Sequence, residues 1–460
     1  MPTKDELFYK RKNAYDLAST EDLTLADLYS EKYKSYLDNA KTEREAIAKA
    51  IELSAANGFV PFVRGMDLKP GTKVYTVSGG KSMVLAVIGK TSLSDGANIA
   101  AAHVDAPRID LKQVPLYEES DLAFFKTHYY GGIKKYQWVA QPLALHGVVV
   151  KKDGTLIEIV IGEDERDPVF MITDLLPHLG KDQEKKALGE AFTGENLNLL
   201  IGSRPIGDEK DDNRVKLNIM TILNEKYGIT EADFLSAEIE AVPLMNARDV
   251  GLDRSMIGAY GHDDRSSAFA ALHAILDTKS PTKTAICVLA DKEEVGSDGV
   301  TGMQSAMFDD FMEDLCEALD VKRRDCYKNS FCLSADVCNA YDPNFADVSE
   351  KLNNAKLGYG IGVMKYSGSR GKSGTSDASA EVVAMLRELF DKNNIVWQTT
   401  QLGKVDQGGG GTVAKFMANR NIATIDAGVP VLSMHAPYEI VSKLDCYMTY
   451  RGILSIYEND

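Results

Sequence analysis

The stretch at residues 284–297, "TAICVLADKEEVGS", decides the fold of this chain. Its first seven residues form a short apolar run, which predicts a strand buried on both faces. Two glutamates, Glu293 and Glu294, follow where the run ends. Adjacent carboxylates at a strand end repel each other and lose hydration, so the pair predicts a positive charge close by.

Similar apolar runs alternate with helical segments from about residue 246 onward. Further runs occur at 331–337 and 422–428, and the segments with helical spacing are 264–277, 308–320, 376–392 and 411–420. Upstream, helices are predicted at 22–40 and 42–58, followed by strand-like runs at 73–89 and 96–107. Such alternation predicts an α/β fold, with a mostly parallel sheet covered by helices on both faces.

The stretch 109–245 does not follow this alternation of strands and helices. It contains two β-rich runs joined through Asp153-Gly154, a strong hairpin turn, and a polar stretch at 180–216 that is expected to be an exposed loop. We therefore predict an inserted β-rich domain at 109–245. It divides an α/β domain into a first part, 1–108, and a second part, 246–460.

Composition narrows the functional classes. The chain has 460 residues, a net charge of −16 and a pI near 5.0, which argues against nucleic acid or an anionic membrane as a partner. No apolar stretch reaches the ~18 residues of a membrane span, and the N-terminus lacks a secretory signal. Six cysteines without a CxxC pair predict free thiols in a reducing compartment, so a cytoplasmic protein is expected.

Histidine and acidic side chains recur at the predicted strand ends. His103 and Asp105 end one strand and, being two residues apart, point to the same side of it. The other candidates follow or precede further strands and helices: Asp263, Asp264, Glu293, Glu294, Asp336 and His435. Open α/β sheets bind ligands at the carboxyl ends of their strands. Histidine with carboxylates suits Zn²⁺, Mn²⁺ or Co²⁺, and such cations would relieve the repulsion between the glutamates.

The glutamate pair then divides into two roles. One carboxylate would coordinate metal, and its neighbour would act as general base toward a water whose pKa the metal lowers to roughly 7. Spacing alone leaves open which glutamate takes which role.

Seven motifs, in order along the chain, resemble the M18 metallopeptidases, the aspartyl aminopeptidase family. They are "AAHVDAPR", "DDRSSAFAAL", "DKEEVGS", "CLSADV", "GVMK", "GGGGTVAKF" and "DAGVPVLSMHAP". The resemblance implies a zinc-peptidase-like mixed sheet flanked by helices, with an inserted β-rich oligomerisation domain. It also implies an aminopeptidase that prefers peptides with acidic N-terminal residues and a homo-oligomer, namely a tetrahedral dodecamer.

The resemblance further implies roles for individual residues. His103, Asp263 and Asp336 would hold one zinc, Asp263 would bridge, and Glu294 with His435 would complete the second site. Glu293 would be the general base, Asp105 would orient His103, and Lys365 would contact the acidic side chain of the substrate.

The chain departs from the family pattern at several positions. Tyr136 stands about where aspartyl members carry a histidine in the inserted domain, and His128 lies nearby but before the glycines. Asp264, Asn339 and Asp342 replace other residues that are usual in the family. These departures leave metal binding intact and put the acidic specificity in question.

Alternative interpretations stay open. A two-metal aminopeptidase of different specificity, a deacylase or carboxypeptidase, and a shell that keeps metals for structure would use similar residues. Asp264 is equally explained as a helix N-cap, and Lys365 as a solvated lysine. His262 and His273 are predicted to be surface and helix residues, and the glycines at 408–411 to mark a helix entry or a close backbone approach.

Overall fold

The computed structural model describes residues 2–459, which divide into two compact units. The first unit comprises the chain up to Asp105, Ala247–Met434 and the residues from Glu439 on. The second comprises Ala106–Asn246 and the short segment His435–Tyr438.

A nine-stranded mixed sheet forms the centre of the first unit, with the order β1-β2-β3-β14-β4-β15-β19-β17-β18. Its strands are β1 (Val60–Pro61), β2 (Lys73–Ser78), β3 (Ser82–Val87), β4 (Ala97–His103), β14 (Thr284–Ala290), β15 (Phe331–Ser334), β17 (Ile361–Met364), β18 (Trp397–Thr399) and β19 (Ala423–Gly428). Strands β14, β4, β15 and β19 are parallel neighbours, whereas β17 runs antiparallel to β19. Hence β4, β14, β15 and β19 all end at the same edge.

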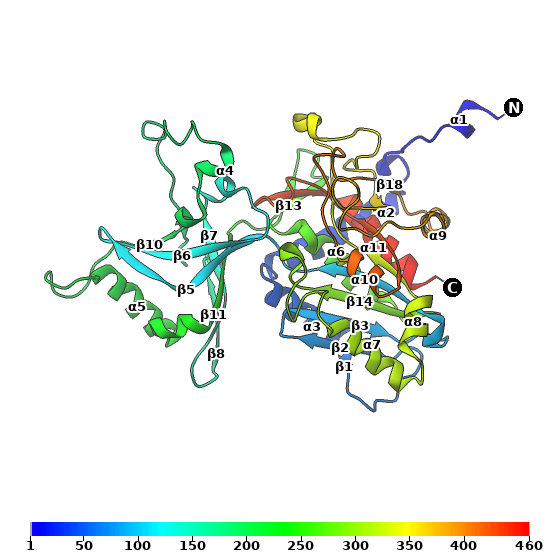
Figure 1. Ribbon diagram of the computed structural model, residues 1–460, viewed down its shortest axis with the longest axis horizontal. Helices are drawn as coiled ribbons and strands as arrows, with labels where there is room; N and C mark the ends of the chain where they lie inside the picture. The colour runs from blue at the N-terminus through cyan, green and yellow to red at the C-terminus, as the bar shows by residue number, and fades with distance from the viewer. Residues whose placement is uncertain (1, 460) are drawn as a thin grey trace. The chain divides into compact units, whose positions relative to one another are not determined.

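The central strands bury both faces, which explains their continuous apolar sequences. In β4, Ala100 and Ala102 pack into one hydrophobic cluster, whereas Ile99 and Ala101 pack into another on the opposite face. The first cluster includes residues of α2 (Thr20–Asp38), α3 (Glu43–Ala56), α6 (His262–Asp277), α9 (Ala380–Lys392) and α11 (Lys443–Tyr457). The second includes residues of α7 (Met307–Ala318), α8 (Arg323–Asn329) and α10 (Ala414–Asn419). The predicted α/β class, a mixed sheet with helices on both faces, is confirmed (Figure 1).

A smaller five-stranded sheet completes the first unit, with the order β12-β13-β21-β20-β16. Its strands are β12 (Arg248–Val250), β13 (Met256–Ala259), β16 (Cys338–Asn339), β20 (Pro430–Leu432) and β21 (Glu439–Ser442). Strand β13 leads directly into α6 and therefore fixes where that helix begins. A short helix, α1 (Lys4–Leu7), lies near the N-terminus of this unit.

The second unit is built on a seven-stranded antiparallel sheet, with the order β8-β7-β11-β5-β6-β10-β9. Its strands are β5 (Arg108–Glu119), β6 (Leu122–Tyr130), β7 (Leu143–Val150), β8 (Leu156–Ile161), β9 (Met171–Ile172), β10 (Leu199–Gly202) and β11 (Ala237–Pro243), and its helices are α4 (Leu188–Ala191) and α5 (Arg214–Tyr227). The expected hairpin joins β7 to β8, and Gly154 adopts the left-handed φ of +86° that this turn requires.

None of the helices among the described residues is both long enough and apolar enough to cross a membrane. All six cysteines are buried and free.

Candidate active site

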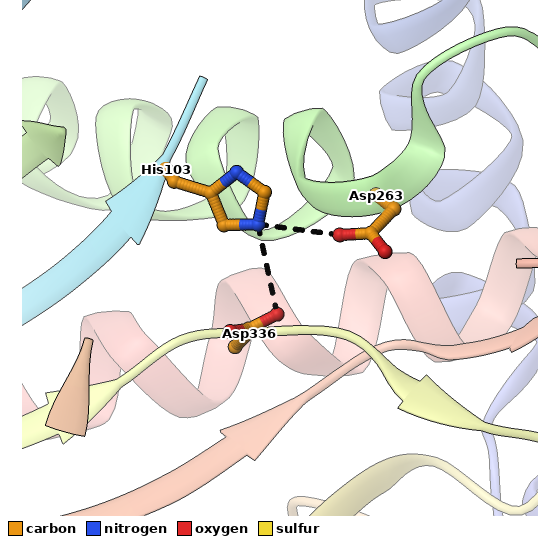
Figure 2. A group of neighbouring side chains, drawn as sticks. All are labelled: His103, Asp263 and Asp336. Carbon is orange, nitrogen blue, oxygen red and sulfur yellow. Dashed lines mark ion pairs between the residues drawn. The ribbon is translucent and has the colours of Figure 1, made fainter. Parts of the chain in front are cut away.

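Three side chains from separate elements of the first unit meet at the carboxyl edge of the nine-stranded sheet (Figure 2). His103 ends β4, Asp263 lies in the first turn of α6, and Asp336 follows β15. The His103 Nε2 atom lies 3.2 Å from Asp263 Oδ1 and 3.9 Å from Asp336 Oδ1. All three side chains are buried.

Asp105 fixes the orientation of the His103 ring. The His103 Nδ1 atom lies 3.0 Å from the Asp105 backbone carbonyl and 3.2 Å from its carboxylate Oδ1. Because a carbonyl oxygen can only accept, Nδ1 carries a proton, and Nε2 is the ring atom that faces Asp263 and Asp336. A ring held in this way is the usual arrangement of a metal-ligating histidine.

Asp263 is held at the entry of α6. Its backbone N–H group donates to the buried Glu439 carboxylate of β21, at 3.1 Å. The helix starts from Gly261, whose φ is +77°, and a Cβ there would lie 1.9 Å from the Arg265 guanidinium. The Asp263–Asp264 peptide bond is cis. Any other residue at 261 would be strained by the positive φ and would displace the Arg265 guanidinium.

In the absence of a cation, burial and mutual repulsion disfavour the ionised form of the Asp336 carboxylate. Burial raises the pKa of Asp336 well above its ordinary value, and the carboxylates of Asp264, Glu293 and Asp263 raise it further, against the opposing effect of His103. Burial lowers the pKa of His103, but hydrogen bonds to Asp105 and Asp263 outweigh it and raise that pKa overall. Crowded, desolvated carboxylates beside a histidine are what a divalent cation stabilises.

The two glutamates stand in a 3₁₀ turn, Glu293–Val295, just after β14. The turn is entered through Lys292, which has a left-handed φ of +72°. The Asp105 carboxylate accepts the backbone N–H groups of Glu293 and Glu294, at 3.1 and 3.2 Å. Carboxylate oxygens of Glu294 and Asp263 lie within 4.8 Å of each other. Asp105 thus connects the histidine at one strand end with the glutamates at the next.

His435 belongs to the short segment that groups with the second unit. Its Nδ1 atom lies 2.8 Å from the Gly132 carbonyl oxygen, so Nδ1 carries the proton and Nε2 keeps its lone pair. The residue adopts a left-handed φ of +65°. Its ring therefore has the tautomer that a metal ligand needs.

Lys365, the proposed contact for the substrate side chain, lies in the first unit. It follows β17, and the antiparallel register pairs Gly362 with Gly428 and Met364 with Asp426. The Gly428 backbone lies against the Asp336 carbonyl, and Lys365 stands three residues after Gly362, the partner of Gly428. Its ammonium pairs with Asp377, which also binds Lys372 at 2.7 Å.

One expectation about the side chains beside the site was wrong. His262 is fully buried rather than on the surface: its Nε2–H donates to the Ile257 carbonyl at 3.1 Å, and its Nδ1 accepts from the Tyr33 hydroxyl at 2.7 Å. Asp264 immediately precedes the regular part of α6, because Asp263 and Asp264 both have non-helical backbone angles. Its side chain is buried and accepts the His103 backbone N–H at 3.4 Å.

Sequence reasoning missed two carboxylates that hold the site together. Glu439 supports the Asp263 backbone, and Asp291 begins the glutamate turn. The sequence does carry a signal for Asp291, because this residue stands between the apolar run 284–290 and the glutamate pair. Glu439 carries no such signal in the sequence.

A family model and a curated relative both match this chain over nearly its whole length. A family model described as "Aminopeptidase I zinc metalloprotease (M18)" matches residues 36–456. A probable M18 family aminopeptidase 1 of Clostridium acetobutylicum is 49% identical over 463 residues, covering 99% of this chain and all of the relative.

Solved structures show the same likeness. The crystal structure of an M18 family aminopeptidase from Thermotoga maritima superposes with a TM-score of 0.94 at 43% identity, covering 98% of this chain and all of that one. The mApe1 dodecamer of S. cerevisiae shares the fold, with a TM-score of 0.77 at 20% identity over 95% of this chain and 97% of that one.

Proposed function

On the premise that this chain belongs to the M18 family of zinc aminopeptidases, we propose that it hydrolyses the N-terminal peptide bond of peptides with two zinc ions per subunit. The observation that carries this proposal is the buried group of His103, Asp263 and Asp336, with Asp105 tying it to the glutamate turn.

The donor set of this group fits zinc. Ligands of a tetrahedral zinc at about 2.0–2.2 Å from the metal lie about 3.3 Å from one another. The distances from His103 Nε2 to Asp263 and Asp336, 3.2 and 3.9 Å, are close to that value. His103, Asp263 and Asp336 would hold one ion, and Asp263, common to both groups, would hold the other with Glu294 and His435. Cobalt or manganese would suit the same donors.

The mechanism assigns distinct roles to the chain's own residues. When bound, the metals supply Lewis acidity that polarises the scissile carbonyl and acidifies the attacking water. Glu293 takes a proton from that water as general base and then returns it to the departing amine. Asp105 holds the His103 ring and the Glu293 backbone in register, so that the base and the ligands keep fixed relative positions.

We also propose a preference for acidic N-terminal residues, with Lys365 as the group that contacts the substrate side chain. A homo-oligomer, namely a tetrahedral dodecamer, is proposed because the related mApe1 is a dodecamer. We place the protein in the cytoplasm, where its six buried free thiols would remain reduced.

A panel of unblocked peptides that begin with Asp, Glu, Leu, Ala or Lys tests this function. Each peptide is assayed with purified protein, after chelation, and after restoring Zn²⁺, Co²⁺ or Mn²⁺. Metal-dependent release of Asp and Glu is the expected result. Cleavage of neutral or basic peptides would keep the two-metal site and reject the acidic preference. Cleavage of N-acylated substrates alone would indicate a deacylase.

A further inference from the structure

Three consecutive backbone N–H groups in the glutamate turn each donate to a carboxylate oxygen. Asp105 accepts from Glu293 and Glu294 at 3.1 and 3.2 Å. Asp291 accepts from Lys292 at 2.8 Å through its Oδ1 atom. The turn that carries both glutamates is therefore held from two sides, by Asp105 and by Asp291.

Asp291 is itself fixed by Thr301. The Thr301 hydroxyl donates to Asp291 Oδ2 at 2.6 Å, and the Asp291 N–H donates to the Thr301 carbonyl at 3.3 Å. The Asp291 side chain is fully buried, and Thr301 is nearly so. This pair closes the loop 291–301, which follows β14 directly and contains both glutamates.

The turn needs such support because of its backbone. Lys292 adopts a left-handed φ of +72°, which costs a non-glycine residue roughly 1–2 kcal/mol. Loss of the acceptor for the Lys292 N–H would remove one of the hydrogen bonds that hold this φ, beside those that the Lys292 carbonyl accepts from Val295 and Ser297. Relaxation of the turn toward an ordinary φ would carry the backbones of Glu293 and Glu294 with it.

We propose that Asp291, fastened by Thr301, is a positioning residue that holds Glu293 in the geometry of a general base; this inference rests on the proposed function. Asp291 acts through the Lys292 backbone and touches neither the substrate nor the metals. Misplacing a reacting group by about 1 Å costs on the order of 10²-fold in rate.

Hydrogen exchange on the metal-free protein tests whether Asp291 holds the glutamate turn. Asp291→Ala should speed amide exchange in a peptide covering 291–297 by roughly tenfold or more. Asp445→Ala is the matched control, because Asp445 is also buried and accepts two backbone N–H groups, those of Gly358 and Gly360, at 2.7 Å each. It should speed exchange near 358–360 and leave 291–297 unchanged. Wild-type exchange at 291–297 in Asp291→Ala would overturn the proposal.

Steady-state kinetics with the zinc-loaded enzyme test whether Asp291 positions Glu293 for catalysis. Asp291→Ala should lower kcat by about 10²-fold and leave KM and the zinc content near their wild-type values. Thr301→Val should produce a smaller loss of kcat, and Thr301→Ser, which keeps the hydroxyl, should restore it. If Asp291→Ala does not fold, the Val and Ser variants decide the question. An unchanged kcat, or an equal loss in Asp445→Ala, would overturn the positioning role.

Different results would contradict the proposed function and the positioning role of Asp291. A wild-type enzyme that cleaves no peptide would count against the proposed function, while the exchange experiment would still test the turn. An active wild type with an equally active Asp291→Ala variant would count against the positioning role alone.

Discussion

The backbone N–H of Glu293 donates a 3.1 Å hydrogen bond to the Asp105 carboxylate, although 188 residues separate the two in the chain. The same carboxylate lies 3.2 Å from the His103 ring nitrogen. The proposed general base and a proposed zinc ligand therefore share one support. Changes at Asp105 should alter turnover and metal binding together, whereas changes at Glu293 should separate them.

Glu293→Gln is expected to lower kcat by about 10²–10⁴-fold, because glutamine cannot accept a proton from water. Its zinc content should remain that of the wild type, since Glu293 is not assigned as a ligand. Steady-state kinetics with metal analysis by mass spectrometry checks both quantities. Glu52→Gln, on the exposed face of α3, serves as the control and should change neither. A Gln variant with wild-type turnover would refute the assignment of the base.

His435→Ala should reduce the zinc content from two ions per chain to one, because only Asp263 and Glu294 would remain at the second site. Equilibrium dialysis against Zn²⁺ measures this stoichiometry. His178→Ala, which removes an exposed histidine of the second unit, should retain two ions. Two ions in the His435 variant would show that this histidine is not a ligand.

Lys365→Met should lower kcat/KM for peptides that begin with Asp by roughly tenfold or more, since a charge-assisted hydrogen bond contributes about 1.5–3 kcal/mol. Peptides that begin with Leu should be cleaved as before. Lys372→Met is the matched control, because Lys372 binds the same Asp377 carboxylate as Lys365. Equal effects of both variants on Asp and Leu peptides would assign Lys365 a role in its loop rather than in the substrate pocket.

His273 should make the first unit less stable in mild acid. Burial lowers the pKa of this histidine to about 4, from an ordinary value of 6.5, as it packs 4.1 Å from the Phe269 ring. A base with a depressed folded pKa contributes full stability above pH 6.5, and this contribution is lost as the pH falls toward 4. The loss is at most about 3 kcal/mol.

Urea unfolding of the metal-free protein at pH 7.5 and pH 5.0 measures this effect. His273→Phe keeps an aromatic ring in the cluster and removes the titrating group, so its midpoint should differ less between the two pH values. An equal pH dependence in both proteins would show that His273 does not cause it.

The fold class could be predicted because the strands of the central sheet are nearly continuous apolar runs. The same pattern placed His103, Glu293 and Asp336 at strand ends, and the parallel pairing of β14, β4 and β15 brings those ends to one edge. The environment of His262 could not be predicted, because it depends on Tyr33, 229 residues away in the chain. The contact between Asp264 and the His103 backbone could not be predicted for a similar reason, because sequence spacing does not reveal it.

The interrupted first unit has a consequence for biosynthesis. Strand β4 pairs with β14 on one side and β15 on the other, and both lie beyond the inserted residues Ala106–Asn246. At about 5–20 residues per second, a ribosome needs roughly 10–40 s to reach β14 after finishing β4. During that interval, β4 lacks both neighbours and leaves apolar edges open to other chains. All strands of the inserted sheet lie within Ala106–Asn246, so this sheet can form before β14 and β15 are synthesised. The nascent chain should therefore depend on chaperones most strongly at this stage.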